Sequence, residues 1–185
     1  MKRAVIPLAI GLGLVLAVVA LLQTQQRERA GFAAPSFRLP TLDGRTVRLE
    51  EFRGKILFLN FWATWCPPCR EEMPAMQRVY ERFRQRPFAM LAVSEDTSAE
   101  PVREFVNALG LSFSIALDPN GQLPEKYGVT GYPETFIIDP SGIVLRHVVG
   151  PLEWDHPDVI RYFEELLAAV EKQTPPAAGQ VVGAQ

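Results

Sequence analysis

Hydrophobic positions follow two different periods in the middle of the chain, and the alternation between them predicts strands and helices in turn. Continuous apolar runs of strand length occupy residues 55–61 and 88–93. After each run, apolar residues recur every three or four positions, first beyond Cys66 and then over 99–109, where the pattern stops at Gly110. This β-α-β-α order predicts a central sheet with helices on both faces.

Shorter patterns predict the rest of the domain. Two alternating runs at 36–39 and 46–49 flank Asp43-Gly44, a dipeptide that favours the tight turn of a β-hairpin. The remaining elements are expected as a short strand at 113–117, one or two helical turns at 123–127, an antiparallel strand pair at 135–138 and 142–149, and an amphipathic closing helix at 159–170. The predicted fold class is α/β, with a mixed sheet flanked by helices.

The N-terminal segment is apolar throughout. Residues 4–22 carry no charge, and their number is close to the ~20 that cross a bilayer as a helix. Lys2 and Arg3 precede the segment, which predicts a cytoplasmic N-terminus and an exported domain, although Arg27 and Arg29 on the far side weaken this bias. The alternative is a cleaved signal peptide, whose apolar region is usually shorter, ~7 to 15 residues. Either interpretation places the domain on the outer side of the cytoplasmic membrane, periplasmic or extracytoplasmic.

Composition is consistent with one domain and limits the possible partners. With 185 residues, 48% of them hydrophobic, the chain can form one core and has no room for a second enzyme domain. A formal charge of -2 argues against nucleic acid as a partner, because that affinity depends on clustered Lys and Arg. The predicted organisation is a cytoplasmic end at 1–3, a transmembrane signal anchor at 4–22, a linker at 23–34, the domain at 35–172 and a disordered tail at 173–185.

The candidate chemistry lies in the run Trp65-Cys66-Pro67-Pro68-Cys69, which holds both cysteines of the chain. The run joins a predicted buried strand to a helix, so the thiols sit where unpaired backbone N–H groups and the helix dipole favour thiolate. We expect Cys66 to be the attacking sulfur and Cys69 the more buried partner that resolves the mixed disulfide, while the two prolines remove N–H donors and tune how reducing the pair is. The alternatives are two unreactive buried cysteines or half of a metal site. Structural zinc is not expected, because the two histidines of the chain are distant in sequence.

Two runs carry a resemblance to a known family: NFWATWCPPCREEMP at 60–74 and GYPETFIID at 131–139. The chain resembles the TlpA-like thiol-disulfide oxidoreductases over 34–170, and within them the cytochrome c maturation reductases of the CcmG/DsbE and ResA type. The resemblance implies a thioredoxin-like fold with an N-terminal β-hairpin and a central insertion. It also implies a cis peptide bond before Pro133, beside the disulfide, which leaves the backbone of Tyr132 free to pair with an extended partner chain.

The resemblance extends to further site residues. Thioredoxin has a buried aspartate at the position of Asn60, and an amide cannot relay protons at ordinary pH. Glu72 matches a family glutamate that approaches the disulfide; partial burial would raise its pKa and suit it to acid-base work on the second cysteine, whereas the alternative is an exposed helix carboxylate. Glu134 is expected to contact a partner protein and Glu95 to line the cleft. Trp65 is expected to cover the thiols and offer an apolar contact surface.

The leading functional prediction is a reductase of exported client proteins that carry a CxxC motif or reactive cysteines, such as apocytochrome c, supplied with electrons by a membrane thiol carrier. No metal or other cofactor is expected. Alternatives within the same chemistry are a reductase of copper chaperones in oxidase assembly and an oxidant that inserts disulfides. A copper-binding protein that uses the cysteine pair as ligands is the alternative from another class, and a peroxidase is the least favoured function.

Overall fold

The computed structural model describes residues 31–173, so the predicted membrane segment at 4–22 and the tail beyond residue 173 lie outside the described residues. No helix within 31–173 is long and apolar enough to cross a membrane. The elements are, in chain order, β1 (Arg38–Pro40), β2 (Thr46–Arg48), the 3-10 helix η1 (Leu49–Phe52), β3 (Ile56–Trp62), α2 (Pro67–Phe83), β4 (Phe88–Ser94), α3 (Ala99–Leu109), β5 (Ser114–Leu117), α4 (Gln122–Tyr127), β6 (Glu134–Ile138), β7 (Val144–Val149) and α5 (Pro157–Gln173).

A five-stranded mixed sheet of order β5-β4-β3-β6-β7 forms the centre of the domain. β3, β4 and β5 run parallel, whereas β6 is antiparallel to β3 and β7 antiparallel to β6. β1 and β2 form a separate antiparallel hairpin around the predicted turn. The expected α/β class and mixed sheet are therefore confirmed.

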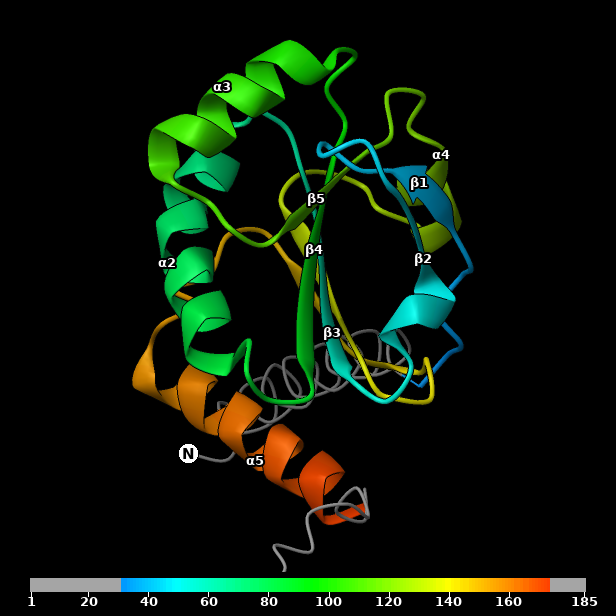
Figure 1. Cartoon of the computed structure of the whole chain (residues 1–185), viewed down its shortest axis with the longest axis vertical. Coiled ribbons are helices and arrows are strands. Elements are labelled where there is room, and N and C mark those ends of the chain that lie inside the picture. Colours follow the sequence, from blue (N-terminus) through cyan, green and yellow to red (C-terminus); the bar gives the residue numbers. More distant parts are fainter. Residues whose placement is uncertain (1–30, 174–185) are drawn as a thin grey trace, which may run out of the picture.

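The two faces of the sheet are covered differently. Successive residues of β3 point to opposite faces, so Phe58 and Trp62 pack with α2, α3 and α5, while Leu59 and Phe61 pack with the hairpin and α4. Figure 1 shows α2 and α3 on one side of the sheet and β1, β2 and α4 on the other. Every residue of β3 is buried, as expected for a strand covered on both faces.

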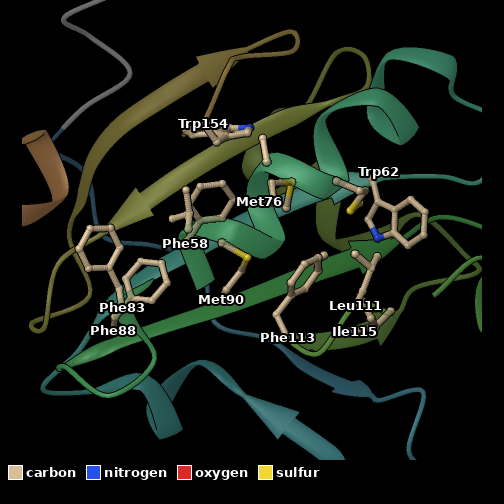
Figure 2. Close-up of a cluster of buried hydrophobic side chains, with 14 of the residues drawn as sticks. Phe58, Trp62, Met76, Phe83, Phe88, Met90, Leu111, Phe113, Ile115 and Trp154 are labelled. Carbon is tan, nitrogen blue, oxygen red and sulfur yellow. The ribbon is translucent and has the colours of Figure 1, made fainter. Parts of the chain in front are cut away.

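The larger core lies beneath α2 and is rich in aromatic side chains. Trp154, from the segment between β7 and α5, packs edge-on against Phe58 with ring centroids 4.6 Å apart. Figure 2 shows these two rings beside Met76 of α2, with Phe83 and Phe88 further along the same core. Trp154 is thereby fixed against the sheet, a position that matters for the site described below.

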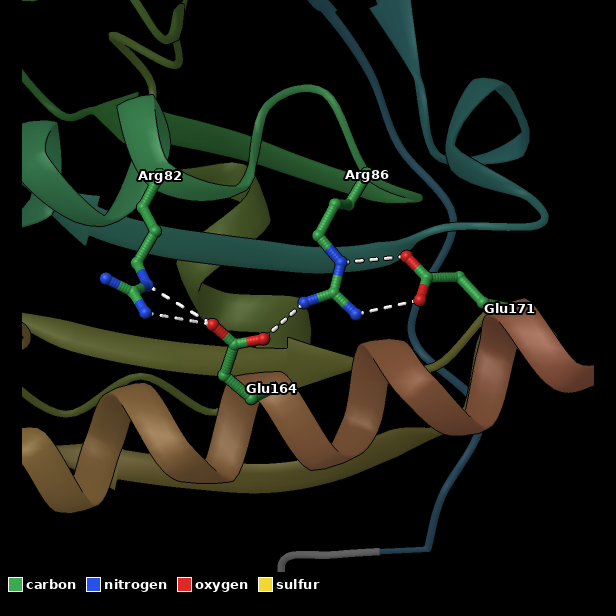
Figure 3. A network of polar contacts seen from close by, with 4 residues as sticks. All are labelled: Arg82, Arg86, Glu164 and Glu171. Atoms are coloured by element: carbon green, nitrogen blue, oxygen red, sulfur yellow. Dashed lines mark hydrogen bonds and ion pairs between the residues drawn. The ribbon is translucent and has the colours of Figure 1, made fainter.

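Helix α5 is attached to α2 by an ion-pair network as well as by its apolar face. Glu164 lies between Arg82 and Arg86, and Arg86 also pairs with Glu171 (Figure 3). Exposed pairs of this kind are individually worth no more than about 1 kcal/mol, but Arg86 is shared between two carboxylates. The network joins α5 to the last turn of α2, through Arg82, and to the loop after α2, through Arg86.

The domain starts earlier than predicted. Residues 31–34, assigned above to the linker, pair with the chain at the start of β7: Ala33 forms an antiparallel bridge with Ile143, and the amide of Gly31 donates to the carbonyl of Val144 at 2.7 Å. At the other end Gln173, expected in the tail, is the last residue of α5. The sequence pattern did not reveal either edge, because each extends the domain by only a few residues.

Candidate active site

The two cysteines lie where β3 passes into α2 and are joined as a disulfide, with an S–S distance of 1.99 Å. Cys66 is the N-cap of α2, and its sulfur accepts a hydrogen bond from the amide of Cys69 at 3.3 Å. Pro67 begins the helix, where its missing N–H has no intrahelical role. Cys66 is 5% exposed and Cys69 fully buried, so an incoming group reaches Cys66 first.

The loop that leads to Cys66 is fixed by a buried carboxylate at the end of β4. Asp96 accepts a hydrogen bond from the amide of Thr64 at 2.9 Å and another from its hydroxyl at 2.5 Å. The hydroxyl of Ser94 donates to the same carboxylate at 2.8 Å. These bonds set the path of the chain just before the reactive sulfur.

A second loop meets the first beside the disulfide. The peptide bond between Tyr132 and Pro133 is cis, and Pro133 is buried. The ring of Tyr132 packs edge-on against that of Trp65, with centroids 5.7 Å apart. Trp65 is 63% exposed, so the two aromatic rings form an accessible apolar surface next to Cys66.

Glu72 is buried on α2, one turn beyond Cys69. Its Oε1 accepts from the amide of Asn60 at 3.1 Å, and its Oε2 accepts from the indole N–H of Trp154 at 2.9 Å and the backbone N–H of Leu152 at 3.3 Å. Burial raises the pKa of Glu72 to about 7, against the opposing effect of these hydrogen bonds. The carboxyl can therefore gain or lose a proton near neutral pH.

Asn60 connects this carboxyl to the sheet. Its side-chain amide also donates to the hydroxyl of Thr135 on β6 at 2.9 Å. Asn60 and Thr135 are paired residues of neighbouring strands, so their side chains lie on the same face of the sheet. The amide orients Glu72 without competing for its proton.

Glu134, the first residue of β6, is fully buried on the opposite face. Its Oε1 accepts from the backbone N–H and the hydroxyl of Thr130, at 2.8 and 3.0 Å, and from the N–H of Gly131 at 3.2 Å. Its Oε2 pairs with Nε2 of His147 at 2.6 Å. This carboxylate holds the chain just ahead of the cis proline.

Glu95 lies at the end of β4 and is half-buried. Burial raises its pKa to about 8, and the nearby charges of Asp118 and Asp96 add to the effect. The pKa of Tyr132 is raised to about 12, mainly by burial and secondarily by the charge of Glu95. Glu95 is thus electrostatically coupled to the cis-proline loop.

The arrangement is suited to exchange of two electrons between thiols and disulfides. Cys66 is the more exposed sulfur and caps a helix N-terminus, a position that favours thiolate, and Cys69 is held within bonding distance of it. Within residues 31–173, no three His, Cys, Asp or Glu side chains are grouped as ligands for a metal ion.

Known proteins share both the sequence and the fold. Residues 30–147 match the model of the AhpC/TSA family. The chain belongs to this family. The thiol-disulfide oxidoreductase ResA of Bacillus thuringiensis subsp. konkukian is 36% identical over 126 residues, which make up 68% of this chain and 73% of the relative. ResA of Geobacillus thermodenitrificans is 38% identical over 136 residues, 74% of this chain and 77% of the relative.

Solved structures agree with these relatives. A protein assigned as the thiol:disulfide interchange protein DsbE from Chlorobium tepidum matches with a TM-score of 0.66 at 35% identity, over 76% of this chain and 96% of that one. A thioredoxin-family thiol:disulfide interchange protein from Chlorobium tepidum TLS matches with a TM-score of 0.63 at 31% identity, over 71% and 95%. This member of the AhpC/TSA family is a thiol-disulfide oxidoreductase of the ResA and DsbE type.

Several predicted site residues of this AhpC/TSA protein come together. Cys66 and Cys69 form the disulfide, with the second cysteine the more buried, and the bond before Pro133 is cis. Trp65 and Tyr132 are in contact at the rim. Glu72 is buried and has a raised pKa, in place of the exposed helix carboxylate that was the alternative.

The expectation that Glu134 contacts a partner protein is wrong for this structure. Glu134 is 0% exposed and its oxygens are occupied by Thr130, Gly131 and His147. The β3–β6 register directs its side chain into the core, because Glu134 is paired with buried Phe61. Glu134 acts within the domain and has no surface to offer.

Two contributors escaped sequence reasoning. Asp96 was not singled out, because its partner Thr64 lies 32 residues away along the chain and no motif links the two. Trp154 lies 82 residues beyond Glu72, its partner. A tryptophan in a short polar stretch between a strand and a helix was the one available signal, since an indole N–H that is buried usually finds an acceptor.

Proposed function

We propose that this oxidoreductase is a membrane-tethered reductase that acts outside the cytoplasm on exported clients, such as apocytochrome c during cytochrome c maturation, with electrons from a membrane thiol carrier. The relatives named ResA and DsbE support the chemistry. The uncharged segment at 4–22 supports the tether and the outward placement of the domain. An oxidising exterior gives a dedicated reductant a purpose.

The observation that carries the proposal is the position of Cys66, the more exposed sulfur of the pair, beside the Trp65–Tyr132 surface, with Glu72 buried one turn beyond Cys69 on α2. In the first step the Cys66 thiolate attacks one sulfur of a client disulfide. A mixed disulfide forms, and the other client sulfur leaves as a thiolate that takes up a proton. The exposed rings give the client chain a surface to pack against while this occurs.

In the second step Cys69 resolves the mixed disulfide. Glu72 accepts the proton of the Cys69 thiol, and the resulting thiolate attacks Cys66. The Cys66–Cys69 bond forms, the client sulfur is released and protonated, and the client has gained two electrons. A dithiol carrier then reduces the pair by the same exchange in reverse, so the protein is ready for another client.

The reduction potential of the pair tests the direction of this reaction. The full chain in detergent is equilibrated with dithiothreitol or glutathione buffers, and free thiols are counted by alkylation, with Cys69→Ser as the control that cannot form the bond. A potential near about -270 mV, the thioredoxin value, is expected for a reductase. A value near about -120 mV would assign the protein as an oxidant, and failure to form the disulfide would favour the copper-binding alternative.

The client is tested by trapping. Cys69→Ser leaves the mixed disulfide on Cys66 unresolved, so a client stays bound until a reductant is added. Cells expressing the full-length variant should yield adducts that contain apocytochrome c. Adducts with a copper chaperone of oxidase assembly in its place would move the function to that client class. Protease treatment of intact spheroplasts should digest the domain while leaving cytoplasmic markers intact, and protection of the domain would contradict the outward placement.

A further inference from the structure

The backbone ahead of the cis proline has an internal anchor on the side of the sheet away from α2. Three donors of this short stretch, the N–H and hydroxyl of Thr130 and the N–H of Gly131, point at a single oxygen of Glu134. Glu134 itself follows Pro133 directly. The chain on both sides of the cis bond is thereby tied to one carboxylate.

That carboxyl group is buried, so its position depends on the groups that bond to its two oxygens. Glu134 is 0% exposed, and a carboxylate without water needs donors on both oxygens. The loop groups bond to Oε1 of Glu134, and Nε2 of His147 lies 2.6 Å from Oε2. Loss of His147 would leave Oε2 without this partner and free the side chain to turn.

His147 is in turn held by the sheet. Its ring stacks on Phe136 with centroids 4.1 Å apart and an interplanar angle of 8°. Phe136 and His147 are paired residues of β6 and β7, and the His147 side chain is 3% exposed. The strand pair thus fixes the position of the His147 ring, and the ring fixes the carboxyl group of Glu134. Glu134 in turn fixes the backbone of the loop.

We propose that His147 is a positioning residue for client docking: through Glu134 it fixes the backbone that presents the cis-proline loop to the client. The inference rests on the proposed function in that the client chain is taken to dock at this loop. It assigns His147 to binding of the client and leaves the sulfur chemistry to the cysteines and Glu72, which lies on the other face of the sheet.

The test compares His147→Phe with the unchanged full chain in detergent micelles. Phe keeps the stack on Phe136 but has no donor for Glu134. His147→Gln restores a donor without the imidazole, and His156→Phe is the matched control, because His156 is about half exposed and far along the chain from the loop. The substrates are an oxidised dodecapeptide with an intramolecular Cys-X-X-Cys-His disulfide and hydroxyethyl disulfide, which is too small to need the loop.

We expect the KM for the peptide to rise about tenfold in His147→Phe, the factor that about 1.4 kcal/mol represents. The kcat, the reaction with hydroxyethyl disulfide and the reduction potential should stay unchanged. His147→Gln should recover most of the affinity, and His156→Phe should behave as the unchanged chain. An unchanged KM, or equal losses with both substrates, would overturn the assignment.

Amide hydrogen exchange gives a readout that needs no client. The N–H groups of Thr130 and Gly131 should exchange about tenfold faster in His147→Phe, because their acceptor is less well fixed. Unchanged protection at both amides would refute the positioning role even if the KM rose. Should the unchanged chain fail to act on the peptide, the reductase proposal fails for this client class, while amide exchange still decides the role of His147.

Discussion

Two glutamates are buried on opposite faces of the central sheet, and they contact it at neighbouring residues of β3, Asn60 and Phe61. Glu72 bonds to Asn60 on the α2 face, whereas Glu134, paired with Phe61, lies on the face covered by α4 and the hairpin. Neutral groups surround Glu72, so burial dominates and its pKa rises to about 7. Glu134 has three donors on one oxygen and an imidazole on the other. The two buried carboxyls therefore differ in their partners: Glu72 has one or two neutral donors on each oxygen beside the cysteines, whereas Glu134 joins a loop to a neighbouring strand.

The largest difference should be seen in stability. Glu134→Leu leaves three loop donors and His147 without their acceptor, and the free energy of unfolding should fall by about 3 kcal/mol or more. Glu72→Leu should cost far less at pH 7, because it removes a carboxyl whose burial is itself unfavourable. Urea denaturation of a soluble fragment of residues 31–173 in the oxidised form measures both. Equal losses would remove the distinction drawn between the two sites.

In the kinetics of disulfide exchange, substitution of Glu72 should have a large effect, although its effect on stability is small. Glu72→Gln keeps the shape but cannot take a proton, so resolution of the mixed disulfide should slow by about 100-fold, the lower range for general acid-base catalysis. The rate of the unchanged protein should rise with pH through an inflection near 7, and that inflection should be lost in the variant. Single-turnover measurements from pH 5 to about 9 give the profile. An inflection that persists in Glu72→Gln would assign the proton to another group.

The pH dependence of stability gives a third contrast. The pKa of Glu72 is about 7 in the folded protein and ordinarily 4.5, so between these values the native state keeps a proton that the unfolded chain has lost. The contribution of Glu72 to stability should thus decrease as pH rises from 4.5 to about 7, by up to about 1.4 kcal/mol per pH unit, and level off above. Unfolding of the oxidised domain and of Glu72→Gln at each pH isolates this slope. Parallel curves for the two proteins would contradict the raised pKa.

The smallest effect is expected from one donor of Glu72. Trp154→Phe keeps the ring in the core but removes the indole N–H that lowers the pKa of Glu72. The inflection of the kinetic profile should move upward by about one pH unit, as the loss of about 1.4 kcal/mol implies. Phe163→Leu, in the same core but without a bond to Glu72, serves as control. An inflection that shifts by the same amount in both variants would indicate that disturbed core packing, and not the lost hydrogen bond, changes the pKa of Glu72.

The order of strands and helices could be predicted because each element has its own periodicity and end signals. The helix over Ala99–Leu109 was predicted with its observed ends, since Gly110 adopts the left-handed conformation that stops it. The cysteines were predictable because they lie in one short motif between a strand and a helix, whereas the roles of Glu72 and Pro133 were implied by the family resemblance. A site can be predicted from the sequence when its interacting residues lie close together along the chain.

The Glu134–His147 pair and the Asp96–Thr64 contact were not predictable, for a shared reason. Each depends on which residues face each other across strands or between a strand end and a loop, and register is set by packing of the whole sheet. A Glu after a proline has the same appearance in sequence whether it points outward or into the core. The face on which a polar residue lies becomes evident once the strands are paired.

The closeness of the two cysteines has a consequence for the whole domain. The two cysteines are three residues apart, so the disulfide closes a very small ring. In the chain-entropy model, the loss of conformational entropy in the unfolded chain then stabilises the fold by about 2 kcal/mol, against about 4.7 kcal/mol for a ring of 100 residues. Cys66 and Cys69 belong to the core cluster on the α2 face, where they are two among many buried side chains, and the cluster on the other face contains neither cysteine. The domain can therefore open and close its disulfide at every turnover and remain folded, so the bond acts as a replaceable store of two electrons and contributes little as a crosslink.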